Sequence, residues 1–266
     1  MHRGVGCVGE KEKPLDLYDH PFYYEVAFGF RDISREVGFF EQCIKKFSKI
    51  KVEKVLDIGC GPSPYMLELA KHGYAFVGLD LSKAMLEYSL EKARKAGIKV
   101  KAVHADMRNF KIEERFDFVF CMLGSIAIES NEDFVSHLDS VAGCLRSGGL
   151  YLIDASINFD WTGLGRERWT VIKNGLIVDV TWEQTPINLV EQKIIDRVVV
   201  EVIGEGKTRV LKTEKVDKIV FPQEFLELVE KNGEFEFAGW YNNFNLAEPL
   251  EKATKINRPI TLIRRK

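Results

Sequence analysis

The sequence has few of the side chains from which metal centres and disulfide frameworks are built. Its five cysteines are widely spaced and include no C-x-x-C pair: Cys7, Cys43, Cys60, Cys121 and Cys144. Its five histidines show no ligand spacing: His2, His20, His72, His104 and His137. An odd, scattered set of cysteines argues against a disulfide framework and against a zinc cage. We therefore expect no bound metal, and a reducing cytoplasm as the location of the protein.

The sequence also lacks the marks of a membrane or nucleic-acid partner. No uncharged apolar run approaches the roughly 18 residues that span a bilayer, and the charged N-terminus has no apolar stretch typical of a signal peptide. Acidic residues number 40 and basic residues 38, and the compact basic cluster is confined to residues 264–266. We expect neither a membrane nor a nucleic acid as partner, because no basic face is present to bind phosphates.

What the sequence does contain is a regular alternation of strand and helix patterns. Short apolar runs typical of buried strands are found at 55–58, 75–79, 100–105, 116–122 and 150–155. Amphipathic helix patterns are found at 33–47, 64–72, 82–96, 133–145 and 222–231. Such alternation indicates an α/β fold with a doubly wound, mostly parallel sheet. Two later strands, near 235–241 and 259–263, bring the expected sheet to seven strands.

A different pattern interrupts this alternation after residue 157. Three or four runs of period two lie between Trp169 and Phe221, separated by hairpin signals at 173–175 and 204–206. We interpret this as an antiparallel insertion whose exposed edges favour a homodimer. The expected organisation is an N-terminal helical and aromatic lid (1–50), a cofactor-binding core (51–157), the antiparallel insertion (158–221), and a C-terminal segment completing the sheet (222–266).

The first expected strand runs into a glycine-containing turn. Gly59 and Gly61 are spaced G-x-G, which lets the backbone pass close to a ligand because no Cβ intrudes. We expect Ser63 to cap the following helix, with Pro64 at its first position. A dinucleotide fingerprint needs a third glycine where Pro64 stands. Asp57, two residues before the first glycine, instead suits the ammonium group at the amino-acid end of a different ligand.

Acidic residues also end the second and third strands. Asp80 can accept hydrogen bonds from both ribose hydroxyls of NAD or of S-adenosylmethionine, so it does not discriminate between them. Asp106 can accept an adenine amino group, with the amide of Met107 at a ring nitrogen. Since parallel strands end at one edge of the sheet, these acids and Asp57 are expected to form a row where doubly wound folds bind ligands.

Five motifs occur in order at the appropriate intervals: Asp57-Ile58-Gly59-Cys60-Gly61-Pro62, Gly78-Leu79-Asp80-Leu81-Ser82, Ala105-Asp106-Met107-Arg108, Phe116-Asp117-Phe118-Val119 and Leu145-Arg146-Ser147-Gly148-Gly149. Over about residues 50 to 155 the chain resembles the class I S-adenosylmethionine-dependent methyltransferases, and more closely the small-molecule branch with the glycine and sarcosine N-methyltransferases. The resemblance implies S-adenosylmethionine as cofactor, S-adenosylhomocysteine as product, and in-line methyl transfer to a nitrogen or oxygen of a small molecule. Ser63 and Ser147 depart from the usual glycine and proline.

The motifs and the resemblance indicate which residues bind the cofactor and which face the substrate, but they identify no catalytic residue. The expected cofactor-binding residues are Asp57, Gly59, Cys60, Gly61, Asp80, Leu81, Asp106, Met107, Met122 and Ser125. The expected substrate-facing residues are the aromatic side chains Tyr18, Tyr23, Tyr24, Trp169 and Trp240. Because the sulfonium already carries the activation, an amine acceptor needs no dedicated base, and no catalytic residue is identified. Cys121 is interpreted as a buried, inert thiol.

Two alternatives stay open at this point. An NAD-linked oxidoreductase shares the sheet and Asp80, although Pro64 and the Asp106-Met107 pair argue against it. A non-catalytic protein that uses S-adenosylmethionine as a signal or as a structural ligand is compatible with every motif. Binding of the two cofactors and a methyl-transfer assay separate these alternatives from an enzyme.

Overall fold

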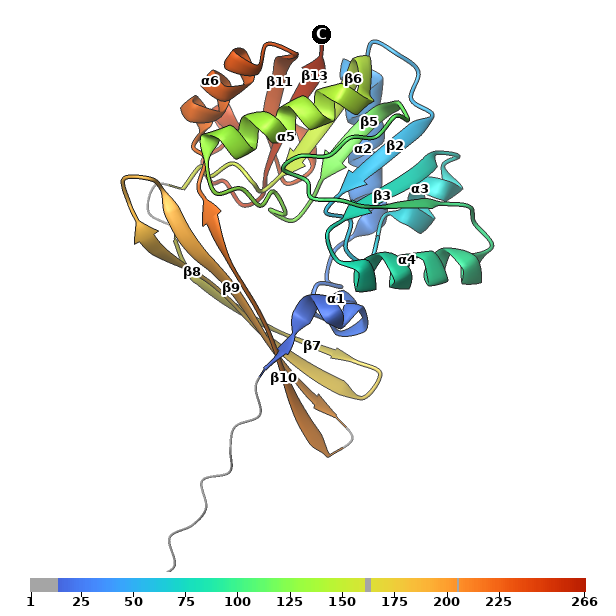
Figure 1. Cartoon of the computed structure of the whole chain (residues 1–266), viewed down its shortest axis with the longest axis vertical. Helices are drawn as coiled ribbons and strands as arrows, with labels where there is room; N and C mark the ends of the chain where they lie inside the picture. The colour runs from blue at the N-terminus through green and yellow to red at the C-terminus, as the bar shows by residue number, and fades with distance from the viewer. Residues whose placement is uncertain (1–13, 161–163, 205) are drawn as a thin grey trace, which may run out of the picture.

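A computed structural model describes residues 14–160, 164–204 and 206–266. Of the predicted lid (1–50), residues 1–13 lie outside the described residues. Within them the chain forms an eight-stranded sheet in the order β12-β11-β13-β6-β5-β2-β3-β4 and a five-stranded sheet in the order β1-β10-β9-β8-β7 (Figure 1). The eight-stranded sheet confirms the predicted doubly wound, mostly parallel α/β class.

The parallel part of the eight-stranded sheet is made of five strands: β2 (Lys54–Ile58), β3 (Ala75–Asp80), β4 (Lys101–His104), β5 (Phe116–Cys121) and β6 (Leu145–Asp154). Antiparallel pairing adds β13 (Pro259–Arg265), β11 (Phe235–Asn242) and β12 (Asn245–Pro249). The strand β12 makes one more than the seven predicted, because residues after Asn242 turn back onto β11. The order along the sheet reverses between β2 and β5, which is the switch point where such folds bind ligands.

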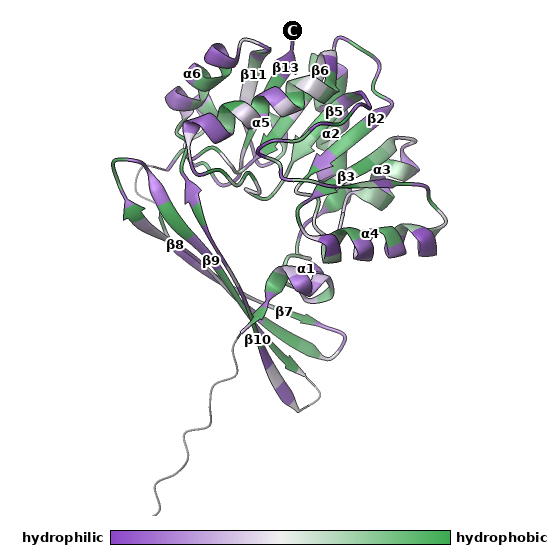
Figure 2. Ribbon diagram, viewed as in Figure 1, coloured by the Kyte–Doolittle hydropathy of each residue, from purple (hydrophilic) through white to green (hydrophobic). Residues whose placement is uncertain are grey.

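Helices cover both faces of this sheet. On one face lie α2 (Ile33–Phe47), α3 (Met66–Lys71) and α4 (Lys83–Ala96), which bury Phe40, Met66 and Ala93 against the strands. On the other lie α5 (Asn131–Cys144) and α6 (Pro222–Asn232), which bury Leu138 and Phe225. Figure 2 shows the central strands as almost continuously apolar, as expected for strands buried on both faces.

The second sheet consists of four long strands and one short one: β7 (Arg166–Lys173), β8 (Leu176–Asn188), β9 (Lys193–Gly204), β10 (Lys207–Lys218) and β1 (Leu15–Asp16). Both central residues of the β7–β8 turn, Asn174 and Gly175, have positive φ, as a two-residue hairpin requires. The short helix η1 (Leu17–Asp19) and α1 (Pro21–Ala27) pack on one face of this sheet through Leu17 and Val26. Figure 1 shows this sheet and α1 on the side toward which the parallel strands point.

The predicted start of the first crossover helix is wrong. The helix α3 begins at Met66, and neither Ser63 nor Pro64 caps it. Ser63 instead adopts a left-handed conformation with φ of 48°, so its backbone belongs to the preceding loop. By contrast, Ser82 caps α4 by accepting from the Met85 amide, and Gly97 ends that helix with φ of 69°. None of the helices in the described part of the chain is both long and apolar enough to cross a membrane.

Candidate functional site

The loop after β2 brings the chain back on itself at the edge of the sheet. Gly59 and Gly61 have φ of 66° and 50°, which side chains with a Cβ rarely adopt. A Cβ on Gly59 would lie 3.1 Å from Met107 Cε and 3.1 Å from Ser125 Cβ. Three of the predicted cofactor-binding residues thus meet at one point, although they come from three separate loops.

Asp57 is buried at the end of β2. Its Oδ2 has no hydrogen-bond partner among residues 14–160, 164–204 and 206–266. Burial raises the pKa of this carboxyl well above its usual range, and the positive charge of Arg31 opposes the shift. Arg31 Nη1 donates to Tyr65 Oη at 3.0 Å, while its buried Nε finds no acceptor within the described chain. An acidic and a basic side chain, each with one polar atom that lacks a hydrogen-bond partner, therefore lie within electrostatic reach of each other beside the glycine loop.

Asp80 connects the ends of β2 and β3. Its Oδ2 accepts from the Gly61 amide at 2.7 Å and its Oδ1 from the Ser82 amide at 2.8 Å. Burial raises the pKa of this carboxyl as well. A carboxylate offers about four acceptor positions, so the backbone donors do not use all of them. Next to it Leu81 is 64% exposed, an apolar side chain left uncovered at the rim of the site.

The third predicted acid is arranged differently. Asp106 is held by Arg108, whose Nε and Nη2 donate to its carboxylate, and this hydrogen bonding lowers the pKa of Asp106. Arg108 thus forms an ion pair with the carboxylate of Asp106. The next residue, Met107, lies over Gly59, and its carbonyl bonds the buried ring of His137 at 2.8 Å. The loop after β4 is therefore held in place by His137, a side chain of α5.

A strained loop follows β5. Leu123 has φ of 58°, and its amide donates to Asp154 Oδ2 at 2.8 Å. The Ser125 hydroxyl donates to the carbonyl of Met122 at 2.6 Å. Cys121, buried at the end of β5, has a pKa raised well above its usual range by burial, as its interpretation as an inert thiol requires. The loop thus presents Ser125 to the glycines while its backbone is tied to β6.

The aromatic residues predicted to face the substrate fall into two groups. Tyr18 and Tyr24 pack together with ring centroids 6.0 Å apart, and Tyr24 Cε1 lies 3.8 Å from the position of a Cβ on Gly61. Tyr23 accepts a hydrogen bond from Arg209, and Trp169 Nε1 donates to the carbonyl of Ala27. These two therefore attach α1 to the antiparallel sheet.

Trp240 is the exception. It is 9% exposed and packs on Phe159 and Phe237 within the core that underlies α5 and α6. The structure does not bring it to the other four aromatic residues.

Two of the predicted cofactor-binding side chains are also buried. The sulfur of Cys60 fills the space above Gly78. Met122 packs in the opposite core, beneath α2 and α3.

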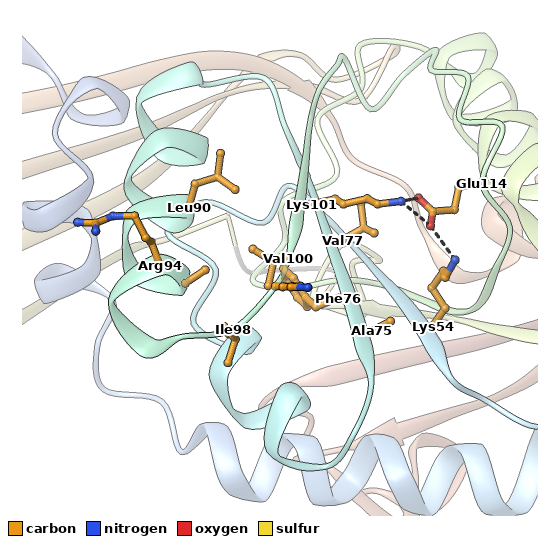
Figure 3. Close-up of a pocket in the computed structure, with 12 residues that line it drawn as sticks. Lys54, Ala75, Phe76, Val77, Leu90, Arg94, Ile98, Val100, Lys101 and Glu114 are labelled. Carbon is orange, nitrogen blue, oxygen red and sulfur yellow. Dashed lines mark hydrogen bonds and ion pairs between the residues drawn. The ribbon is translucent and has the colours of Figure 1, made fainter.

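A separate hollow of about 530 Å³ lies at the other end of the strands (Figure 3). It is lined by the first residues of β3 and the last turns of α4, among them Ala75, Phe76 and Leu90. At its rim Lys54 and Lys101 both pair with Glu114. Since the glycine loop stands at the carboxyl ends of these strands, the hollow takes no part in the site.

Comparisons with known proteins agree with this geometry. Residues 55–149 match the family described as "Methyltransferase domain". The chain is 32% identical over 125 residues to a dTDP-3-amino-3,6-dideoxy-alpha-D-glucopyranose N,N-dimethyltransferase of Streptomyces fradiae, over 47% of each chain. The chain spans about half the length of the curated relatives it matches.

Two solved structures are similar over nearly the whole chain. An S-adenosylmethionine-dependent methyltransferase from Clostridium acetobutylicum has a TM-score of 0.75 at 18% identity, covering 91% of this chain and 95% of that one. A sugar N-methyltransferase from Streptoalloteichus has a TM-score of 0.73 at 20% identity, covering both chains fully. At these identities the likeness establishes the fold, and the domain match confirms the resemblance that the motifs indicated.

Proposed function

We propose that this chain, whose residues 55–149 form a class I methyltransferase domain, transfers a methyl group from S-adenosylmethionine to a nitrogen or oxygen of a small molecule. The observation that carries the proposal is the arrangement at the switch point. Asp57 and Asp80 flank a loop in which Gly59 and Gly61 have the positive φ that close backbone approach requires. This is the edge at which doubly wound sheets bind their ligands.

The residues present fit the two ends of the cofactor. The methionine end carries an ammonium and a carboxylate, and the unpartnered Asp57 Oδ2 and Arg31 Nε are of the matching charges. The adenosyl end carries two ribose hydroxyls, for which the Asp80 carboxylate has free acceptor positions. The exposed Leu81 and the side chain of Met107 supply apolar surface for the base.

The reaction requires little of the protein beyond positioning the acceptor against the methyl group. When bound, the sulfonium supplies the activated methyl group; the acceptor lone pair forms the new bond to the methyl carbon as the carbon–sulfur bond breaks and its electron pair returns to sulfur. The chain aligns the reactants and excludes water, which contributes up to about 7–11 kcal/mol. Tyr18, Tyr24 and Ser125 surround the loop at which that alignment occurs.

A small-molecule acceptor is favoured over a macromolecule by the charge distribution and by the neighbours. The net charge is −2, with 40 acidic against 38 basic residues, which is not the basic excess typical of a nucleic-acid-binding protein. Two of the similar proteins act on sugars, according to their names. An NAD-linked oxidoreductase is disfavoured because Pro64 stands where its fingerprint needs glycine. In addition, no helix begins at Ser63, so this loop lacks the helix N-terminus that binds a pyrophosphate in such enzymes.

Two measurements test this function. Isothermal titration calorimetry should show binding of S-adenosylmethionine and S-adenosylhomocysteine, and none of NAD. A tritiated-methyl transfer assay over amines, carboxylates and phenols should then give a labelled small-molecule product. Binding without transfer to any acceptor class favours the non-catalytic alternative, and tight NAD binding instead would reject the proposal.

We also propose that the protein works in the cytoplasm as a homodimer formed through the antiparallel insertion. Cys43, Cys60, Cys121 and Cys144 are buried and unpaired within the described residues, which suits a reducing compartment. On the outer face of the insertion Ile172, Ile177 and Ile203 lie side by side in neighbouring strands and are 75%, 40% and 40% exposed. Light scattering of the wild type and of Ile172→Asp tests this: the wild type should be dimeric and the variant monomeric.

A further inference from the structure

Charged side chains gather on the inner face of the antiparallel sheet, outside the cofactor site. Side chains alternate along a strand, so Lys215 and Asp217 of β10 share a face with Leu211, and Asp196 of β9 shares a face with Val200. Leu211 and Val200 pack on η1 and α1, which identifies this face as the one turned inward. Charged groups at such a place need a reason, because burial penalises them.

The two acidic side chains on this face are paired in different ways. Lys215 Nζ pairs with Asp217 Oδ2 at 2.7 Å. Both oxygens of Asp196 accept from neutral donors, Trp182 Nε1 at 3.0 Å and Gln184 Nε2 at 3.1 Å. Lys215 lies directly opposite Asp196 in the strand register, and Arg209 on the same face donates to the hydroxyl of Tyr23, so the carboxylates of this face lie among basic side chains.

One oxygen of this group is left unused. Asp217 is 8% exposed, and in the described part of the chain its buried Oδ1 has no hydrogen-bond partner. The pKa of Asp217 is raised by burial, opposed by Lys215, and raised further by the charges of Asp196 and Glu129. A buried carboxylate oxygen without a donor destabilises the fold, unless a ligand supplies that donor.

The inner face lies opposite the cofactor edge. Desolvation raises the pKa of the Tyr18 hydroxyl, and the negative charges of Asp196, Asp80 and Asp217 raise it further, so all three carboxylates lie within electrostatic reach of this hydroxyl. Burial raises the pKa of Tyr24 and of Cys121, which is at the end of β5, and the positive charge of Lys215 opposes both shifts. The end of β10 lies against the loop after β5, where the Lys218 amide donates to the Ile128 carbonyl at 2.7 Å, and Figure 1 shows β10 on the side toward which the parallel strands point.

We propose that Asp217, supported by Asp196, binds the amino group of the methyl acceptor, so that the substrate is a small polar amine. This inference rests on the proposed function. A carboxylate oxygen accepts an N–H from an amine in either protonation state, and it leaves the lone pair of the neutral form free to point at the methyl carbon. Asp217 and Asp196 are acceptor-binding residues, distinct from Asp57 and Asp80 at the cofactor.

The test uses the full chain with Asp217→Asn, which keeps the size of the side chain and removes its charge. The matched control is Glu201→Gln, which removes a charge from the exposed outer face of the neighbouring strand β9. Saturation-transfer NMR on protein loaded with S-adenosylhomocysteine measures binding of glucosamine and ethanolamine, with glucose and ethylene glycol as amine-free counterparts. Calorimetry measures the affinity of each variant for S-adenosylmethionine.

We expect the wild type and Glu201→Gln to bind the amines in preference to their counterparts, and Asp217→Asn to bind them at least tenfold more weakly. The affinity for S-adenosylmethionine should stay within twofold in all three proteins. Equal binding of amine and counterpart by the wild type, or unchanged amine binding by Asp217→Asn, would overturn the inference alone. If the wild type fails to bind S-adenosylmethionine, the proposed function itself falls.

Discussion

The amide of Leu123 donates a hydrogen bond to Asp154 Oδ2 over 2.8 Å, joining the strained loop after β5 to the end of β6. The same carboxylate pairs with Arg258, whose Nε and Nη2 donate to both of its oxygens. Arg258 also lies 3.5 Å from Glu36, which accepts from the hydroxyl of Tyr65. One arginine from the C-terminal segment therefore holds two buried acids, and through one of them it holds the loop that carries Ser125.

Replacing Arg258 with Met should destabilise the fold by about 3–5 kcal/mol, because it leaves the fully buried Asp154 without its cation. Urea unfolding measures the change. The control is Lys51→Met, which breaks an ion pair whose side chains are 83% and 66% exposed, and which should change stability far less because solvent screens the pair. Equal effects of the two substitutions would contradict a structural role for Arg258.

Much of the sheet was predictable because strand and helix periodicity is a local property. The helix Ile33–Phe47 has the predicted bounds, and Gly97 ends α4 where its left-handed preference places it. The prediction failed at Ser63 and Pro64, although both are residues typical of a helix start. Packing of the loop against Asp80 and Ser89 fixes its backbone, so the helix begins only at Met66.

The site itself was predictable only in its sequence motif. Asp57, Gly59 and Asp80 are recognisable because their spacing at strand ends is fixed by the fold. Arg31 and Asp217 carry no such pattern: each acquires its place because a distant segment packs over the sheet edge. Trp240 shows the converse, since an aromatic residue gives no local sign of whether it faces a ligand or the core.

Arg31→Met should weaken binding of S-adenosylmethionine by about 10- to 150-fold, corresponding to the roughly 1.5–3 kcal/mol of a hydrogen bond to a charged group. Methylthioadenosine lacks the amino-acid end, so its affinity should stay unchanged. Asp80→Asn should weaken both ligands, because both contain the ribose. Calorimetric titration of the two ligands into the two variants gives four affinities. Parallel losses for both ligands in Arg31→Met would show that Arg31 does not contact the carboxylate.

The stability of the protein should depend on pH through His137. Burial lowers the pKa of His137 to about 4, and its ring bonds the carbonyl of Met107 and the hydroxyl of Tyr151. Between pH 6.5 and 4 the unfolded chain binds a proton at this residue and the folded chain does not, so stability falls as the pH falls. From pH 6.5 to 5 the loss is roughly 2 kcal/mol.

Urea unfolding at several pH values checks this contribution. His137→Asn, which retains a donor for Met107, should lower stability at pH 7 and flatten its fall toward pH 5 relative to the wild type. If His137→Asn and the wild type lose stability in parallel, His137 is not the group that titrates.

Two glycines with nearly the same φ make it possible to distinguish the effect of backbone strain from the effect of contact with the cofactor. Gly59 and Gly97 have φ of 66° and 69°, so adding a Cβ at either position should lower the free energy of unfolding by about 1–2 kcal/mol. A Cβ at Gly59 would lie 3.1 Å from Ser125 Cβ, whereas one at Gly97 would meet nothing within 4 Å. Gly59→Ala should therefore lose stability and at least tenfold in affinity for S-adenosylmethionine, while Gly97→Ala should lose only stability. Chemical denaturation and calorimetry on the same preparations compare them; equal cofactor affinities in the two variants would place the cofactor away from the loop after β2.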